Sequence, residues 1–181
     1  MLQSRSIAAI RIAGEVKRYH TKRTIGVQSV GEHSWNVALL VFALVKTPSL
    51  DLIKAALLHD VAEVSVGDIP APVKRSSPEM KEQVNKLEDD FLRRIGIDYP
   101  ELSIGEENIL KVADTLELVL YCQEQMHMGN AALNPVYQTG LTYLYGYLDK
   151  SPQVVSQKVQ EILSDVTLNI NMIEQGEVIN E

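Results

Sequence analysis

Apolar residues recur with a helical period along most of the chain, and no segment shows the strict alternation that is typical of a half-buried strand. Ile7, Ile10 and Ala13 form one stripe, and we expect Trp35 and Phe42 of a second stripe to lie in the core. The pattern predicts seven helices, at residues 4–16, 32–45, 50–64, 78–95, 103–127, 135–148 and 153–173. The expected fold class is therefore all-α, a bundle of about six or seven helices.

Two segments interrupt the helical pattern for long enough to be loops. Residues 17–31 are mostly polar, and residues 65–77 are rich in glycine and proline. On an all-α scaffold, functional residues are expected on such loops. The chain has 181 residues, which fits one domain with a substantial core. We therefore expect residues 1–181 to form a single domain, with a frayed tail from about residue 174.

The charge balance argues against binding of a nucleic-acid polymer. The net charge is −7, whereas a nucleic-acid groove needs a basic face to neutralise phosphates. Positive charges do cluster locally in the two loops, as VKRYHTKR and as VKR. An acidic chain with basic loops fits a pocket for a small phosphorylated ligand.

The sequence also bears on the location of the protein. It contains no apolar segment long enough to span a bilayer, and its N-terminal segment lacks the pattern of a secretory signal peptide. The single cysteine, Cys122, excludes an intrachain disulfide and fits a reducing compartment. We expect a cytoplasmic protein, bacterial or phage-encoded, with no membrane partner.

Four residues of strong metal-ligand types stand out. His33, His59, Asp60 and Asp114 lie in or beside helical segments that are otherwise apolar. A charged aspartate in an apolar run is costly unless a metal ion or another partner compensates it. A mixed imidazole and carboxylate set suits one divalent transition metal, such as Co²⁺, Mn²⁺, Zn²⁺, Ni²⁺ or Fe²⁺. The set therefore predicts a metal-dependent hydrolase.

The spacing of these residues restricts how they could meet. His59 and Asp60 are adjacent, so they differ by about 100° around a helix and could share an ion only near a helix end or a kink. Glu63 follows His59 by one turn and projects from the same face. Asp114 would reach the ion from a facing helix of the bundle.

Taken one at a time, the proposed ligands also have ordinary structural interpretations. His33 could bond to backbone at the start of a helix, and His59 could be a hydrogen-bonded core histidine. Asp114 could simply pair with Lys111, one turn earlier on the same helix. The metal hypothesis therefore depends on the convergence of all four side chains.

The loops add residues that suit a phosphorylated ligand. Arg18 could hold a phosphate as a bidentate fork and Lys74 as a point charge, although either could equally be a surface charge. Tyr19 could stack on a base or sugar, or pack in the core. Asp68 could cap local backbone after Gly67, or place a carboxylate near the metal.

Three segments together resemble a known family. RYHTKRTIGVQSVGEHS, ALLHDVAEVSVGDIPAPVK and LKVADTLEL occur in the order and spacing of HD-domain metal-dependent phosphohydrolases. The resemblance covers about residues 5–150 and is greatest to the 5′-deoxynucleotidase branch and its phage-encoded relatives. A His-Asp dipeptide alone is nonspecific, but the whole series of motifs is highly specific. The resemblance implies the all-α HD-domain bundle.

The resemblance also implies a role for each matching position. The metal ligands would be His33, His59, Asp60 and Asp114; the acidic catalytic residues would be Glu63 and Asp68; and the phosphate contacts would be Arg18, Lys74 and Lys111. Tyr19 replaces the tryptophan that is usual in this branch, beside the sugar or phosphate. Thr21, in the same loop, is expected near the base.

The implied activity is hydrolysis of the 5′-phosphate of deoxynucleotides, with release of deoxynucleoside and phosphate from a dNMP. A second hypothesis is a dNTP triphosphohydrolase for dATP, which would release tripolyphosphate and use Mg²⁺ as an additional ion. A third is a nucleotide-sensing module that retains the scaffold without chemistry. The resemblance further implies a homo-oligomer, a dimer or larger. The tyrosine-rich helix at residues 135–148 is either its interface or ordinary core.

Overall fold

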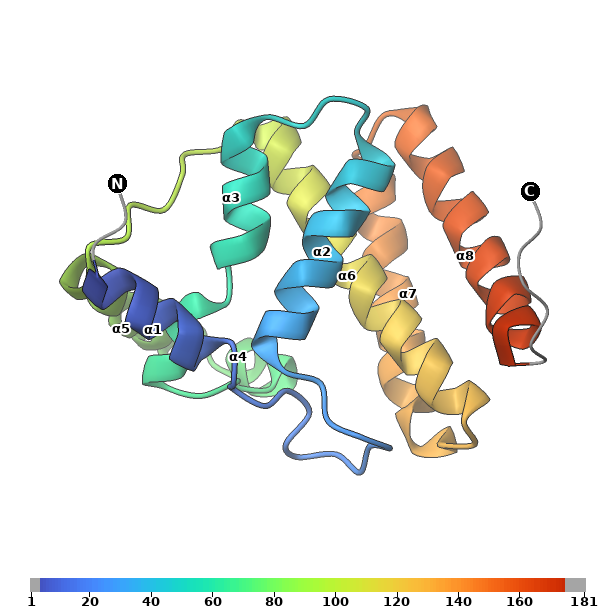
Figure 1. Ribbon diagram of the computed structural model, residues 1–181, viewed down its shortest axis with the longest axis horizontal. Helices are drawn as coiled ribbons and strands as arrows, with labels where there is room; N and C mark the ends of the chain where they lie inside the picture. The colour runs from blue at the N-terminus through green and yellow to red at the C-terminus, as the bar shows by residue number, and fades with distance from the viewer. Residues whose placement is uncertain (1–3, 175–181) are drawn as a thin grey trace.

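The computed structural model describes residues 4–174, with the side chains of all but Arg75 and residues 166–174. Within this range the chain folds into α-helices and two short 3₁₀ helices, which confirms the all-α prediction (Figure 1). The helices are α1 (Ser4–Ala13), α2 (Val30–Leu44), α3 (Leu50–Leu58), η1 (Val61–Ser65), α4 (Ala71–Ser76), α5 (Pro78–Ile95), α6 (Ile104–His127), η2 (Ala131–Leu133), α7 (Asn134–Leu148) and α8 (Gln153–Glu174). The predicted fraying concerns the tail that lies outside the described residues.

Helix α6 is the central element of the larger core. It packs against α2, α3 and α7, and α8 covers the edge of the bundle beside α2 and α7 (Figure 1). Ile109, Val112, Leu116 and Val119 form its buried stripe, at the spacing of one helix face. They meet apolar side chains of the neighbouring helices, among them Val37, Val41, Leu44, Leu52, Ala56, Leu144, Leu148, Val155 and Val159. None of the helices between residues 4 and 174 has the length and apolar character needed to cross a bilayer.

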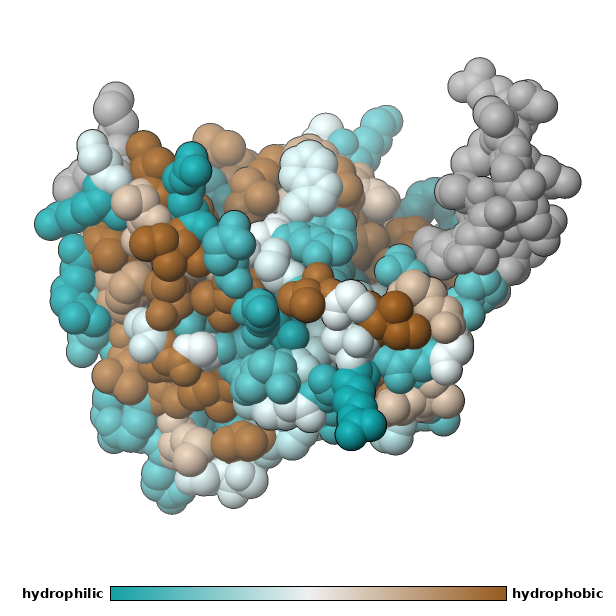
Figure 2. Space-filling view, turned by 60° about the horizontal axis from the view of Figure 1, so that its bottom comes forward, coloured by the Kyte–Doolittle hydropathy of each residue, from teal (hydrophilic) through white to brown (hydrophobic). Residues whose placement is uncertain are grey.

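A second, smaller core fixes the segment that follows α3. Ala13 of α1, Val61 of η1 and Ile97 after α5 are buried together, away from the main bundle. Helices α1, α4 and α5 gather on this side of the molecule (Figure 1). Hydrophobic side chains also reach the surface there, over the left part of the face in Figure 2. The buried Val61 holds η1 between α1 and α5, at one side of the His59–Asp60 pair.

The third predicted helix, residues 50–64, is wrong as one continuous helix. Helix α3 ends at Leu58, Asp60 has φ −104° and ψ 5°, and the chain continues as the 3₁₀ helix η1. No glycine or proline marks this break. It arises from tertiary packing, since the Val61 side chain is buried in the smaller core, to which His59 and Asp60 do not belong. The predicted loop 65–77 also contains the short helix α4, which has a proline in its first turn.

The prediction that Trp35 and Phe42 are buried is also wrong. Their exposed fractions are 61% and 54%. Helix α2 instead buries Val37, Val41 and Leu44, which have the same one-turn spacing. Because α2 is apolar on both faces, periodicity alone could not distinguish the core face from the surface face.

A close backbone crossing closes the loop between α1 and α2 at its base. The amide of Gly31 donates to the carbonyl of Gly14 at 3.1 Å, and the amide of Val30 donates to the carbonyl of Val16 at 2.8 Å. A Cβ at position 31 would lie 3.1 Å from the Gly14 oxygen and 3.2 Å from its Cα. A side chain at position 31 would therefore crowd the Gly14 backbone, and the crossing sets the position of the loop 17–29.

Replacing Gly31 with alanine is expected to lower the free energy of unfolding by about 1–2 kcal/mol, because the overpacking cost exceeds the helix-propensity gain. The melting temperature should fall by roughly 2–8 °C. Gly105→Ala is the matched control, since Gly105 is likewise the second residue of its helix and no atom lies within 4 Å of its Cβ position. Equal melting temperatures for the two variants would contradict the packing account.

Candidate metal and phosphate site

Four side chains from three parts of the chain lie close together. His33 Nε2, from the first turn of α2, lies 3.2 Å from His59 Nε2 and 3.1 Å from Asp114 Oδ1. Asp60 Oδ2 lies 3.5 Å from His33 Nε2 and 3.4 Å from His59 Nε2. His59 Nε2 and Asp114 Oδ1 are 4.0 Å apart. The side chains that the sequence predicts as ligands are therefore gathered from α2, α3 and α6, as the metal hypothesis requires.

The distances among His33, His59 and Asp60 fit one metal ion. Ligand bonds of about 2.0–2.2 Å place neighbouring ligand atoms roughly 3–3.6 Å apart. The distances among His33, His59 and Asp60 are in or close to that range. Asp114 Oδ1 lies 3.1 Å from His33 Nε2 and 4.0 Å from His59 Nε2, outside the group of three whose ligand atoms all lie within 4.8 Å of one another, so Asp114 borders the site. His33 is fully buried, whereas the Asp114 side chain is 44% exposed, so the cluster can be reached from solvent on the Asp114 side. Two imidazoles and two carboxylates suit a divalent transition metal.

The break after α3 explains how two adjacent residues reach the same point. His59 is the C-cap of α3, and its Nδ1 lies 2.9 Å from the carbonyl oxygen of Ala56, which leaves Nε2 for the cluster. Asp60 lies just beyond the helix end, so the 100° separation of a continuous helix does not apply. The condition for sharing an ion, a helix end or kink at this dipeptide, is therefore met.

The surroundings of His33 favour positive charge. Burial and the Arg18 guanidinium lower the pKa of His33, but hydrogen bonds with Asp114 and Glu117 outweigh them and raise it to about 9. Burial likewise acts to raise the pKa of Asp60, and the charges of His59 and Arg18 reverse this and lower it. The same anionic environment would stabilise a divalent cation.

Arg18 borders the metal cluster. Its Nη1 lies 2.7 Å from Asp60 Oδ2, and its side chain is only 12% exposed. Burial would lower its pKa, but the Asp60 carboxylate reverses this and keeps the guanidinium charged. Its Nε is buried and has no hydrogen-bond partner among the described residues. The guanidinium thus places a positive charge next to the metal ligands, where it would attract an anion such as phosphate.

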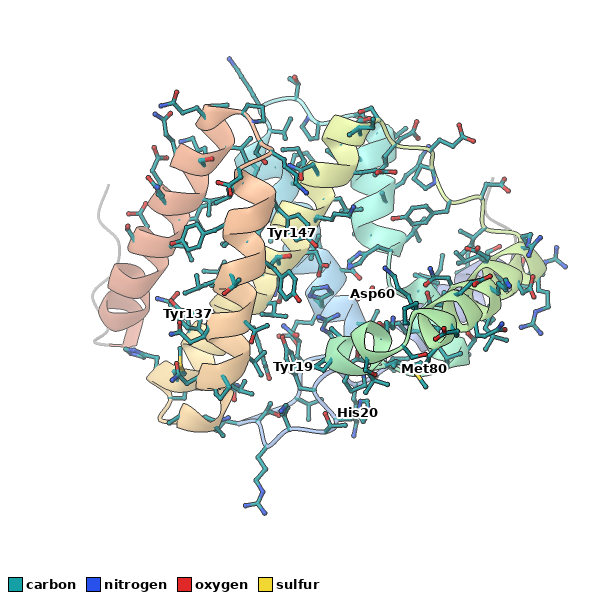
Figure 3. The ribbon with its side chains drawn as sticks, turned by 180° about the vertical axis from the view of Figure 1, so that it is seen from behind. Tyr19, His20, Asp60, Met80, Tyr137 and Tyr147 are labelled. Carbon is teal, nitrogen blue, oxygen red and sulfur yellow. The ribbon has the colours of Figure 1, made fainter. Side chains whose placement is uncertain are left out.

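Tyr19 lies in a backbone conformation that few residues other than glycine adopt. Its φ is 55°, and its amide donates to Asp68 Oδ2 at 3.2 Å. The Tyr19 ring stacks on Tyr121, with centroids 4.8 Å apart, and the Arg18 guanidinium lies 5.8 Å from its centroid. Such strain persists where surrounding structure enforces it, which is common in binding loops. Tyr19 and Asp60 both lie between the α6–α7 pair and the α4–α5 pair (Figure 3).

Glu63 is buried beside the cluster without being part of it. It is 6% exposed, and its Oε2 has no hydrogen-bond partner among the described residues. Burial, followed by the charges of Asp60 and Asp68, raises its pKa to about 8. A carboxyl group with this environment suits proton transfer near neutral pH.

Three predicted phosphate or base contacts are not gathered at the cluster. Thr21 is exposed in the turn closed by the Lys22 amide and the Tyr19 carbonyl. Lys74 Nζ lies 3.4 Å from Glu88 Oε1, on the α4–α5 side, although its charge lowers the pKa of Glu63. Lys111 is exposed on α6, one turn before Asp114. Their roles in substrate binding stay predictions.

A family model described as 5′-deoxynucleotidase YfbR-like matches residues 7–163. The chain belongs to this family of phosphohydrolases. A 5′-deoxynucleotidase of Vibrio atlanticus is 29% identical over 153 residues, which cover 72% of this chain and 79% of that one. A 5′-deoxynucleotidase of Shewanella oneidensis is 28% identical, with 87% of this chain and 91% of the relative covered.

Solved structures of HD phosphohydrolases share the fold of this YfbR-like chain. The cyanophage S-2L HD phosphohydrolase DatZ, bound to dA and one catalytic Zn²⁺ ion, has a TM-score of 0.73 at 22% identity, with 92% of this chain and 98% of DatZ covered. An HD-domain phosphohydrolase from Listeria innocua also has a TM-score of 0.73 at 22% identity, with 94% and 90% covered. The predicted HD-domain fold is confirmed.

Sequence reasoning missed several residues around this YfbR-like site. Glu117 contacts His33 Nδ1, and Gln28 donates to Glu117. Burial and the charges of Asp60 and Asp114 raise the pKa of Tyr99 to about 12. Only Glu117 carried a usable indication, because it is a charged residue in an apolar helix, one turn after Asp114.

Proposed function

We propose that the protein is a divalent-metal-dependent phosphohydrolase that releases phosphate and deoxynucleoside from deoxyribonucleoside 5′-monophosphates. The convergence of His33, His59, Asp60 and Asp114 beside Arg18 carries this proposal, because it joins a cation site to an anion donor. The substrate class is supported by relatives named 5′-deoxynucleotidase and by a structural neighbour bound to dA.

The chain's own residues divide the work between binding and proton transfer. The metal ion, when bound through the two histidines and two aspartates, supplies Lewis acidity that activates water and polarises a phosphate oxygen. Arg18 holds the phosphate through its charged donors. Glu63 takes a proton from the attacking water as the phosphorus–oxygen bond forms, and returns it to the O5′ that leaves. Asp68 holds the Tyr19 amide and so fixes the loop that carries Arg18.

The donor atoms of the site suggest which metals to test, and Cys122 bears on the cellular location. The histidine and carboxylate donors accept Co²⁺, Mn²⁺, Zn²⁺, Ni²⁺ or Fe²⁺, and the catalytic Zn²⁺ of DatZ makes zinc the first ion to test. A cytoplasmic enzyme fits the single free cysteine, Cys122, which is buried. The partners would be small deoxynucleotides and not nucleic-acid polymers.

Product analysis tests the proposal against its alternatives. The purified protein would be incubated with Co²⁺, Mn²⁺ or Zn²⁺ and a panel of dNMPs and dNTPs, with ribonucleotides as controls. Orthophosphate and deoxynucleoside from dNMPs are expected. Tripolyphosphate from dATP would replace this function with a triphosphohydrolase, for which Lys74 and Lys111 would hold the additional phosphates. Nucleotide binding without turnover under all conditions would identify a sensing module.

Replacing Arg18 with alanine is expected to weaken dNMP binding roughly 10- to 100-fold, because a charge-assisted hydrogen bond to phosphate contributes about 1.5–3 kcal/mol. Metal content should not change. Calorimetric titration and metal analysis would measure the two effects separately. Arg23→Ala is the matched control, since Arg23 is an exposed arginine of the same loop. Unaltered dNMP affinity in the Arg18 variant would remove this residue from the phosphate site.

The expected homo-oligomer has a candidate interface on α2. Trp35, Leu39 and Phe42 are 61%, 49% and 54% exposed and form one row at one-turn spacing. On α7, in contrast, Tyr137 and Tyr147 pack against the main core, and Tyr143 and Tyr145 are exposed. We therefore propose that a second copy of the chain covers the α2 row rather than the tyrosine-rich helix.

Light scattering after size exclusion is expected to give the mass of a dimer or larger assembly for the native chain. Trp35→Glu should shift that mass towards a monomer, because a charge would be buried at the interface. Tyr145→Glu, on the exposed side of α7, should leave the mass unchanged. The opposite pattern would return the interface to α7, and a monomeric native chain would refute the oligomer.

A further inference from the structure

A buried carboxylate lies directly behind the metal cluster. Glu117 is on α6, one turn after Asp114, and is only 3% exposed. Its Oε2 lies 2.5 Å from His33 Nδ1, and Gln28 Nε2 donates to its Oε1 at 2.6 Å. Burial of a carboxylate is costly without such partners. The two contacts therefore account for its position.

These contacts determine how His33 presents its ring. Nδ1 faces Glu117, while Nε2 faces His59 and Asp114. A carboxylate oxygen accepts hydrogen bonds, so this contact favours the His33 tautomer that carries its proton on Nδ1. The lone pair of a neutral His33 then lies on Nε2, on the side of the other metal ligands. A carboxylate in this position also makes an imidazole a stronger ligand.

Gln28 connects this carboxylate to the loop that carries Arg18. Gln28 is 2% exposed, and its backbone carbonyl accepts a hydrogen bond from the Arg18 amide at 2.9 Å. Its side-chain amide donates to Glu117. Gln28 thus binds the Arg18 backbone through its own backbone carbonyl, and it binds Glu117, the partner of His33, through its side chain.

We infer that Glu117 is the positioning residue of the metal site: it keeps the proton of His33 on Nδ1, directs Nε2 at the ion and, through Gln28, ties the Arg18 loop to the same ligand. This inference rests on the metal-dependent function proposed above. It predicts that metal affinity depends on a residue that does not itself bind the ion.

Glu117→Gln is the main test, because it preserves volume but removes the negative charge that faces His33 Nδ1. Its amide oxygen can still accept from His33, and its NH₂ group can donate to Gln28 Oε1 once the Gln28 amide turns over, so the change tests the charge of Glu117 and not the number of its hydrogen bonds. Zn²⁺ affinity of the metal-free full chain, measured by titration against a chelator, should fall roughly 10- to 100-fold. Glu124→Gln is the matched control, because Glu124 lies two turns later on α6 and lines one surface cavity together with Glu117. Its Zn²⁺ affinity should stay within about twofold of native.

A reciprocal exchange separates positioning from a general structural role. In the double variant Gln28→Glu/Glu117→Gln, the amide oxygen at position 117 can accept from His33 while its NH₂ donates to the new carboxylate at position 28. Most of the lost Zn²⁺ affinity should return. In the zinc-loaded native chain, NMR should show a slowly exchanging His33 Nδ1 proton, and Glu117→Gln should shift that resonance.

The outcomes separate this inference from the proposed function. Native Zn²⁺ affinity in Glu117→Gln, or equal losses in Glu117→Gln and Glu124→Gln, would overturn the positioning role. In the zinc-loaded native chain, a His33 proton on Nε2 in place of Nδ1 would overturn it even if the variants did not fold. Failure of the native chain to bind any of the divalent metals would instead refute the proposed function.

Discussion

Replacing His59 with alanine is expected to remove the metal and the activity together. The variant would lose one of two imidazole ligands, and turnover should fall on the order of 10³-fold, since the charge stabilisation that an ion supplies amounts to several kcal/mol. His59 is a cleaner choice than its neighbours. Asp60 also pairs with Arg18, and His33 also contacts Glu117, so changes there would disturb more than the ion.

The measurement pairs metal analysis of the purified protein with phosphate release over a range of added Co²⁺ or Mn²⁺. His20→Ala is the control, because His20 is an exposed histidine in the loop 17–29. It should keep native metal content and turnover. If His59→Ala bound metal and hydrolysed dNMP as well as the native chain, the ligand assignment would fail. Recovery of turnover only at high metal concentration would agree with a weakened site.

The ligand types could be predicted from the sequence, but their geometry could not. His33, His59, Asp60 and Asp114 stood out because charged or imidazole side chains in apolar helices need partners. The break after Leu58 brings the His59–Asp60 pair to one point, yet it has no local sequence marker. It depends on the burial of Val61 against α1 and α5, which is a long-range contact.

Residues that act through other residues were the hardest to identify. Gln28 looked like an ordinary polar loop residue, and only the closed base of the loop places it against α6. Trp35 shows the opposite error, because an apolar residue on an apolar helix was assigned to the core and lies on the surface. In both cases the sequence gives the chemical type of the residue, while tertiary packing decides what it faces.

Replacing Glu63 with glutamine is expected to remove turnover while the metal stays bound. Glutamine matches glutamate in volume, so the buried space beside the cluster stays filled and the four ligands are undisturbed. It cannot take up and return a proton, however, and loss of a general acid–base group typically costs about 10²- to 10⁴-fold in rate. The effect should appear in kcat, with a smaller change in KM.

The raised pKa of Glu63 supports this division between chemistry and metal binding. Burial and the charges of Asp60 and Asp68 raise it to about 8, so the group can exist in both protonation states near neutral pH. Metal content and kcat would be measured on the same preparation. Glu82→Gln is the control, because Glu82 is an exposed α5 residue whose partner is Lys86, 2.7 Å away. Loss of metal from Glu63→Gln would make Glu63 a support of the cation site, and native turnover would exclude it from proton transfer.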